Sequence, residues 1–224
     1  PDQLPADDLL QLSAEARQSG ELLLAAFALE AIPENSARFL EASQQLQQLR
    51  FDQGRFLDVL ALGRRIIEQH PKSALARLLM AQAHEQLGDP LTALESYRTA
   101  LGQRQLLAPD EHATALRRAI RIALQTGEFA EARDWSAELK EYAKPTVDDR
   151  LAEAELRRLT GEAADAWDIA NELAEREPSN PAVLELRGTL ALERSDEITA
   201  EHDFREVLRR QSWNKGAHYK LAQV

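Results

Sequence analysis

Apolar residues recur along this chain at intervals of three and four, the spacing that places them on one face of an α-helix. The stretch 71–101 shows the pattern twice, on either side of the turn Leu87-Gly88-Asp89-Pro90. Glycine suits the left-handed position that ends a helix, and proline suits the first turn of the next, where no backbone N–H is needed. The stretch therefore predicts two short amphipathic helices joined by a tight turn. Such a pair cannot bury both of its apolar faces, so it needs neighbours of the same kind.

The same turn recurs along the sequence. Its glycine returns at intervals of 34 residues, with one interval of 39, and serine takes the sixth place: Gly20, Gly54, Gly88, Gly127, Gly161 and Ser195. Five residues after each turn stands a residue without a long side chain: Ala25, Val59, Ala93, Ala132, Ala166 and Ala200. Residues that suit a helix N-cap precede several of the first helices: Ser73, Thr146, Asn180 and Asn214. A short residue held in register six times predicts a close approach of two helix backbones.

At these positions the chain resembles the tetratricopeptide repeat (TPR) family, whose unit is a 34-residue helix–turn–helix. Further matches are the small residues of the first helices, two inter-repeat prolines and two large residues of the second helices: Ala81, Ala154, Gly188, Ala222, Pro71, Pro178, Tyr97 and Phe204. Three positions depart from the family pattern. Gln47 and Gly63 stand where a small and a large residue are usual, and Arg187 stands at a normally apolar place. The resemblance implies an all-α fold, a right-handed α-solenoid of about six repeats plus a C-terminal helix.

This register predicts a single array over residues 1–224. After a lead-in at 1–5, the first repeat has helices near 7–18 and 21–32. The repeats are expected at about 6–39, 40–73, 74–112, 113–146, 147–180 and 181–214, with a terminal helix at 215–224. The third repeat is five residues longer, and we expect Leu106 and Leu107 to prolong its second helix until Ala108-Pro109-Asp110 stops it. The terminal helix either caps the array or leads into further repeats. Because the chain also begins with proline, we expect a fragment of a larger bacterial TPR scaffold.

Composition narrows the possible chemistry. The 224 residues are 44% hydrophobic, 5% aromatic and 29% charged, and the net charge is −11. The longest apolar run, 22–29, is far shorter than the roughly 20 residues that a membrane span requires. No cysteine is present, the five histidines lack metal-ligand spacing, and the recurring glycines belong to helix hinges rather than to a phosphate loop. We therefore predict no catalytic residue, no cofactor and no metal ion.

The family resemblance places the binding groove on the first helices. The positions that would face solvent there are Gln44, Gln45, Gln48, Gln82, Glu85, Gln86, Arg117, Arg118, Arg121, Asp148, Glu155, Arg158, Glu185 and Thr189. Arg117, Arg118 and Arg121 share one helix face. They either hold a ligand carboxylate or phosphate or pair with acidic residues of adjacent repeats. The lysine and asparagine set with which TPR cochaperones hold a C-terminal carboxylate is not matched.

A net charge of −11 repels nucleic acid and favours a basic protein partner. The first hypothesis is thus a non-catalytic scaffold or adaptor that docks a basic protein or peptide. By family analogy it belongs to a bacterial envelope or exopolysaccharide-export assembly in the periplasm, with the cytoplasm as the alternative. A second hypothesis is a helper domain of a larger enzyme, such as a transferase. A third is a self-associating array that stacks through its terminal helix.

Overall fold

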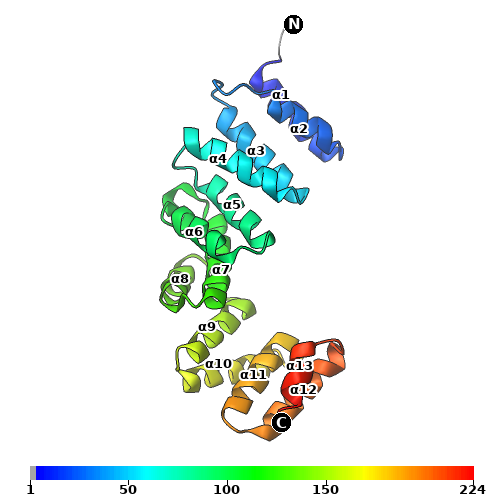
Figure 1. Ribbon diagram of the computed structural model, residues 1–224, viewed down its shortest axis with the longest axis vertical. Helices are drawn as coiled ribbons and strands as arrows, with labels where there is room; N and C mark the ends of the chain where they lie inside the picture. The colour runs from blue at the N-terminus through cyan, green and yellow to red at the C-terminus, as the bar shows by residue number, and fades with distance from the viewer. Residues whose placement is uncertain (1–3) are drawn as a thin grey trace. The chain divides into compact units, whose positions relative to one another are not determined.

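The computed structural model describes residues 4–224, and these residues form thirteen α-helices, one 3₁₀ helix and no strand (Figure 1). Residues 1–3 of the expected lead-in lie outside the described part of the chain. The chain divides into two compact units, one up to Ala115 and the other from Leu116 to Val224. Each unit is described by itself below.

Unit 1 contains three helical hairpins. Their helices are α1 (Ala6–Gln18) with α2 (Leu22–Glu30), α3 (Phe39–Asp52) with α4 (Phe56–Gln69), and α5 (Ala74–Gln86) with α6 (Pro90–Leu101). The second helix of each hairpin also packs on the first helix of the next, so that apolar side chains are buried from hairpin to hairpin. The sequence predicts that the second helix ends at Ile32, whereas α2 ends two residues earlier, at Glu30.

The boundary between the units falls within α7 (Pro109–Thr126). Unit 2 continues with α8 (Phe129–Tyr142), and then with the hairpins α9 (Val147–Leu159) with α10 (Ala163–Arg176) and α11 (Pro181–Glu193) with α12 (Glu197–Arg210). A last helix, α13 (Lys215–Leu221), packs on α12. The prediction of an all-helical repeat array is confirmed.

The recurring hinges adopt the backbone conformation that the sequence predicts. All five hinge glycines have positive φ angles, and Ser195, with a φ of 62°, is the one other described residue in that region. At Gly88 the N–H of Asp89 donates to the carbonyl of His84 at 2.9 Å, a Schellman closure that satisfies the end of α5. The four predicted N-caps are also confirmed, since each side chain accepts a hydrogen bond from a backbone N–H of its helix.

The column of short residues lies in the interior of the repeats. All six of its members are fully buried: Ala25, Val59, Ala93, Ala132, Ala166 and Ala200. A longer side chain at these positions would have to displace the facing helix. Their burial accounts for the short side chains, and the close approach of two helix backbones stays a prediction.

Each departure from the repeat pattern has a local compensation. The amide of Gln47 fills the space beside Gly63 and donates to the carbonyls of Val59 and Ala76, at 3.1 and 3.2 Å. Arg187 donates from Nε and Nη2 to the two carboxylate oxygens of the fully buried Asp203, both at 2.7 Å. In both places the polar side chain donates hydrogen bonds to polar partners.

The expectation that Leu106 and Leu107 prolong a helix is wrong. Helix α6 ends at Leu101, and a 3₁₀ turn follows at Arg104–Leu106. Pro109 then begins α7 instead of stopping a helix, because the first turn of a helix does not use the proline nitrogen as a donor. The carboxylate of Glu111 accepts the N–H of Ala108 at 3.0 Å and so completes this helix start.

Candidate functional site

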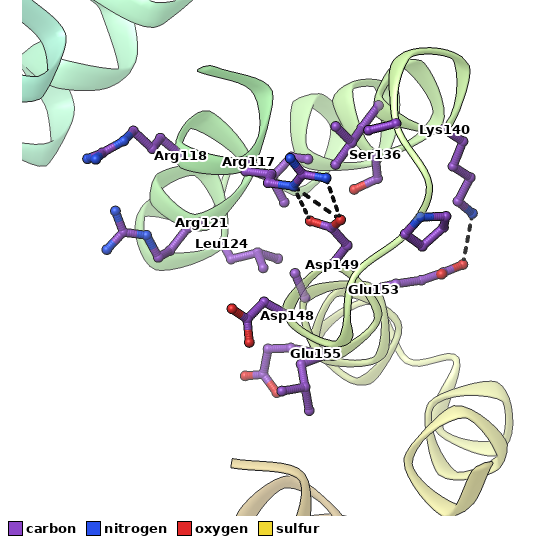
Figure 2. Close-up of a pocket in the computed structure, with 16 residues that line it drawn as sticks. Arg117, Arg118, Arg121, Leu124, Ser136, Lys140, Asp148, Asp149, Glu153 and Glu155 are labelled. Atoms are coloured by element: carbon purple, nitrogen blue, oxygen red, sulfur yellow. Dashed lines mark hydrogen bonds and ion pairs between the residues drawn. The ribbon is translucent and has the colours of Figure 1, made fainter. Parts of the chain in front are cut away.

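The main pocket of unit 2 lies between α7, the C-terminal half of α8 and α9, and we call it the α7–α9 pocket (Figure 2). Its volume is about 460 Å³. The walls are apolar and consist of Ile120, Leu124, Leu139, Ala143, Pro145, Leu151 and Ala152. Ile120 and Leu139 are buried, whereas Leu124, Leu151 and Ala152 are partly exposed. Apolar surface is therefore accessible from solvent within a concave site of the size that commonly binds ligands, roughly 300–1,000 Å³.

Arg117 and Asp149 join α7 to the start of α9 at one edge of this pocket. Arg117 donates from Nε to Oδ1 of Asp149 at 2.9 Å and from Nη2 to Oδ2 at 3.0 Å. Asp149 also accepts the backbone N–H of Thr146 at 2.9 Å, which closes the predicted capping box. Burial alone would raise the pKa of Asp149, but the hydrogen bonds from Arg117 and Thr146 outweigh burial and lower it below its usual value. The sequence left two roles open for Arg117, binding a ligand anion or pairing with an acidic residue of an adjacent repeat. In the structure Arg117 pairs with the adjacent repeat.

The mouth of the α7–α9 pocket carries opposite charges on its two edges. Arg118 and Arg121 line the edge formed by α7, while Asp148 and Glu155 line the edge formed by α9. Figure 2 shows these four side chains directed to the same open side of the pocket. Two of the three predicted arginines therefore lie at the mouth of an apolar pocket, facing carboxylates of the next hairpin.

A second, shallower pocket adjoins the first along α9 and shares Leu151 and Glu155 with it. Its volume is about 290 Å³, and it extends between α9, α11 and α13. Arg158 lies here and donates to both oxygens of Glu155, at 2.8 and 2.7 Å, and to Glu193 at 2.6 Å. These bonds raise the pKa of the Arg158 guanidinium above its ordinary value. Glu185 and Thr189 line the same pocket, so the groove positions predicted on α9 and α11 form one continuous surface.

The groove residues predicted earlier in the chain belong to unit 1. Gln44 donates to Ser73 Oγ at 3.0 Å, Gln48 donates to Asp52 at 2.7 Å, and Glu85 accepts the hydroxyl of Tyr97 at 3.3 Å. Gln82 is partly exposed on α5. Gln44 also lines a pocket of about 560 Å³ with Leu40 and Leu75. For Gln44, Gln48, Gln82 and Glu85, as for Arg117, Arg118, Arg121, Glu155 and Arg158, a role in binding stays a prediction.

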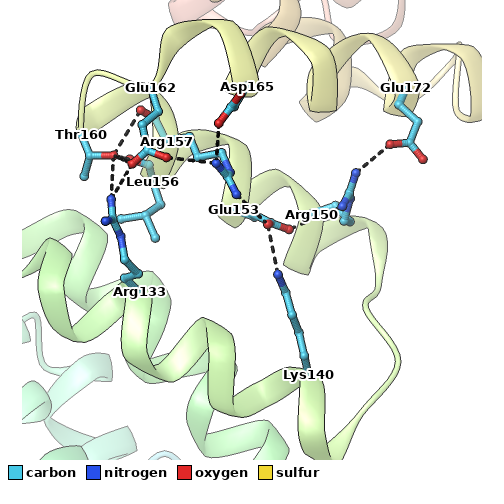
Figure 3. Close-up of polar contacts among 10 residues, drawn as sticks. All are labelled: Arg133, Lys140, Arg150, Glu153, Leu156, Arg157, Thr160, Glu162, Asp165 and Glu172. Carbon is cyan, nitrogen blue, oxygen red and sulfur yellow. Dashed lines mark hydrogen bonds and ion pairs between the residues drawn. The ribbon is translucent and has the colours of Figure 1, made fainter.

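Ion pairs connect α8 with α9 and with Glu162, the residue before α10 (Figure 3). Lys140 contacts Glu153 at 3.1 Å, and Arg133 donates to Glu162, which Arg157 also contacts at 3.0 Å. A gap of about 250 Å³ remains between α8 and α9 on this side. Buried apolar clusters lie among α9–α13, and α8 itself buries Ala132 and Leu139.

Two further properties of the described residues bear on the chemistry. Within residues 4–224, no group of three or more histidine, aspartate or glutamate side chains is arranged to hold a metal ion. In the same range, no helix combines the length and the apolar character that crossing a bilayer requires.

Sequence reasoning missed the walls of the pocket. Ile120, Leu124, Leu139 and Leu151 follow ordinary helical spacing, and nothing in that spacing distinguishes a pocket wall from a packed core. The 39-residue interval before Gly127 was the available signal, because it shows that the repeat is altered just before this place.

Stacked helical hairpins with a groove along their first helices define an α-helical repeat protein. The sequence model of the tetratricopeptide repeat family matches residues 39–106 and 78–146, and the hinges continue in register on both sides of these matches. The chain belongs to the tetratricopeptide repeat family. No curated protein sequence matches it.

Solved structures show the same fold. Pseudomonas aeruginosa pilF has a TM-score of 0.72 at 17% identity, covering 98% of this chain and 97% of its own. A tetratricopeptide repeat protein from Parabacteroides merdae has a TM-score of 0.65 at 20% identity, covering 97% of both chains. YrrB, described as a TPR protein with an unusual peptide-binding site, has a TM-score of 0.66 at 12% identity, covering 80% of this chain and 89% of its own.

Proposed function

We propose that this chain is a non-catalytic interaction protein, a scaffold or adaptor that binds a segment of a basic partner protein in the α7–α9 pocket. The observation that carries the proposal is an accessible apolar pocket of about 460 Å³ with charged edges. A peptide side chain that enters this pocket removes apolar surface from water, and the charged edges orient the peptide. The peptide-binding site described for YrrB supports the same kind of function.

The charges support a binding role more than a catalytic one. The carboxylates of Asp149, Glu153 and Glu155 are each held in an ion pair, with Arg117, Lys140 and Arg158. Groups held in this way stabilise the walls. The net charge of −11 attracts basic proteins over long range, and this attraction weakens with salt. The charge therefore favours a basic partner.

The proposal is tested by capture from the lysate of the source organism on immobilised chain, at about 50 and about 500 mM salt. The screening length falls from about 14 Å to about 4 Å across this range. We compare the wild type with Ala152→Trp, which fills the pocket, and with Ala164→Trp on the exposed face of α10 as the matched control. We expect a basic protein that the wild type and the control retain and the pocket variant loses. Equal recovery on all three, or recovery of no partner, would contradict the proposal.

The finer expectations, a place in an envelope or exopolysaccharide-export assembly and self-association through residues 215–224, stay predictions. So does the alternative of a helper domain within a larger enzyme. Light scattering of the chain with and without residues 215–224 tests self-association, and a mass that does not change with concentration would exclude it.

A further inference from the structure

The walls of the α7–α9 pocket determine which kind of side chain it takes, and this inference rests on the function proposed above. At about 30 Å³ per molecule, liquid water filling the pocket would amount to about 15 molecules. Leu124, Leu151 and Ala152 offer those molecules no hydrogen-bond partners. A bulky apolar side chain that replaces this water is favoured because it covers the walls on several sides at once.

The edges of the pocket determine what stands next to that side chain. On the α9 edge Glu155 is paired with Arg158, and beneath the edge Asp149 is paired with Arg117. Asp148 differs from both, because it is exposed and has no ion-pair partner within residues 4–224 (Figure 2). Its position in the first turn of α9 stabilises that helix, but its carboxylate also points to the open side of the pocket.

The α7 residues that line the opposite edge include no carboxylate that could take a cation. The charged residues at the mouth on that side are Arg118 and Arg121. A basic residue of the ligand is therefore directed to the α9 side, toward Asp148. The overall charge of −11 attracts a basic segment to the chain as a whole.

We infer that the α7–α9 pocket recognises a protein segment in which a bulky apolar residue, Leu, Met or Phe, adjoins Lys or Arg. The apolar side chain enters between Leu124 and Leu151, and the cation pairs with Asp148. The apolar group supplies the anchor, and the charge pair sets the direction in which the segment crosses from α7 to α9.

The absence of cysteine makes the test direct. In Ala152→Cys the introduced thiol lies in the pocket wall, and its labelling by an uncharged maleimide reports occupancy; Leu124→Cys provides a second reporter on the facing wall. The probes are capped model peptides, acetyl-Gly-Ser-Gly-X-Z-Gly-Ser-Gly-amide, with X as Leu or Ser and Z as Lys or Glu, each also made with X and Z exchanged. At about 5 mM peptide, a dissociation constant of about 1 mM slows labelling about sixfold.

We expect the Leu/Lys peptide to slow labelling and the Ser/Lys and Leu/Glu peptides to have little effect. Asp148→Asn should remove the preference for Lys over Glu, whereas Asp168→Asn, an exposed aspartate on α10, should keep it. Equal protection by the Ser peptides would overturn the apolar anchor, and equal protection by the Leu/Glu peptide would overturn the role of Asp148. Labelling that slows with protein concentration would assign the pocket to a second copy instead.

If no peptide protects either thiol, the ligand assignment is wrong. The scaffold function is judged separately, because a partner that is lost on Ala152→Trp in the capture experiment would still support binding at this pocket. If no peptide protects the thiols and no captured partner is lost on Ala152→Trp, both the proposed ligand and the proposed function are wrong.

Discussion

Arg117 on α7 holds Asp149 on α9 through hydrogen bonds of 2.9 and 3.0 Å, and the same carboxylate caps the first turn of α9. One aspartate thus completes the N-terminal cap of α9 and also fastens that helix to α7. The pair also closes one edge of the α7–α9 pocket, so its geometry positions the walls on both sides.

We predict that this pair makes the stability of the protein depend on pH in the acid range. The folded-state pKa of Asp149 lies below the unfolded value of about 3.9, so its contribution is present above that value and is lost as the pH falls through the folded pKa. Asp149→Asn should lower the free energy of unfolding by about 1–2 kcal/mol at pH 7 and flatten its decline below about pH 4. Urea unfolding followed by circular dichroism measures both effects. Asp168→Asn is the control, and an identical acid slope in wild type and Asp149→Asn would contradict the prediction.

Gly63 is required by the packing of Gln47 and Met80 against it. A Cβ atom at this position would lie 2.5 Å from Met80 and 2.6 Å from Nε2 of Gln47. We expect Gly63→Ala to destabilise unit 1 by about 1–3 kcal/mol, as overpacking usually does. The double variant Gln47→Ala/Gly63→Ala should lose less than the sum of the single variants, because the two residues share one space. Gly102→Ala meets only ordinary contacts and serves as the control in thermal melting; additive losses would refute the shared packing.

Asp203 is fully buried, and its charge is balanced by Arg187. Arg187→Met leaves that carboxylate without its cation and should cost about 3–5 kcal/mol at neutral pH. Arg187→Met/Asp203→Leu should recover most of the loss, because an apolar pair can replace a buried ion pair. Arg205→Met breaks an exposed pair and should cost less than about 1 kcal/mol. Denaturant titration compares them, and a double variant no more stable than Arg187→Met would show that the charge balance is not the cause.

The contacts of α8 with α9 and α10 should weaken with salt. The pairs Lys140–Glu153 and Arg133–Glu162 lie near the surface, where each contributes about 0.2–1 kcal/mol. Between about 50 and 500 mM salt, we expect faster hydrogen exchange in α8, and little change in α11–α12, where apolar side chains form the contact. Glu153→Gln should reduce the salt response of α8. An equal response in α8 and α11 would mean that the ion pairs do not hold this joint.

Much of the fold could be predicted from the sequence, because its signals act within one or two helical turns. The glycine at position 88 needs a positive φ, Asn180 and Thr146 cap the helices that follow them, and Ala132 is short because it is fully buried. Each requirement is local, and it repeats at a fixed interval, so the sequence reveals both the unit and its recurrence.

The site depended on the tertiary structure. The residues Arg117, Arg118 and Arg121 look equivalent on one helix face, yet Arg117 is held by a carboxylate 32 positions away while its two neighbours line the mouth of a pocket. Leu106 and Leu107 likewise suggested a longer helix, but the chain forms a 3₁₀ turn and a new helix there. Helical periodicity states which face of a helix is apolar, not how far the next helix stands from it. That distance determines whether Leu124 and Leu151 form a packed core or the open pocket that they line here.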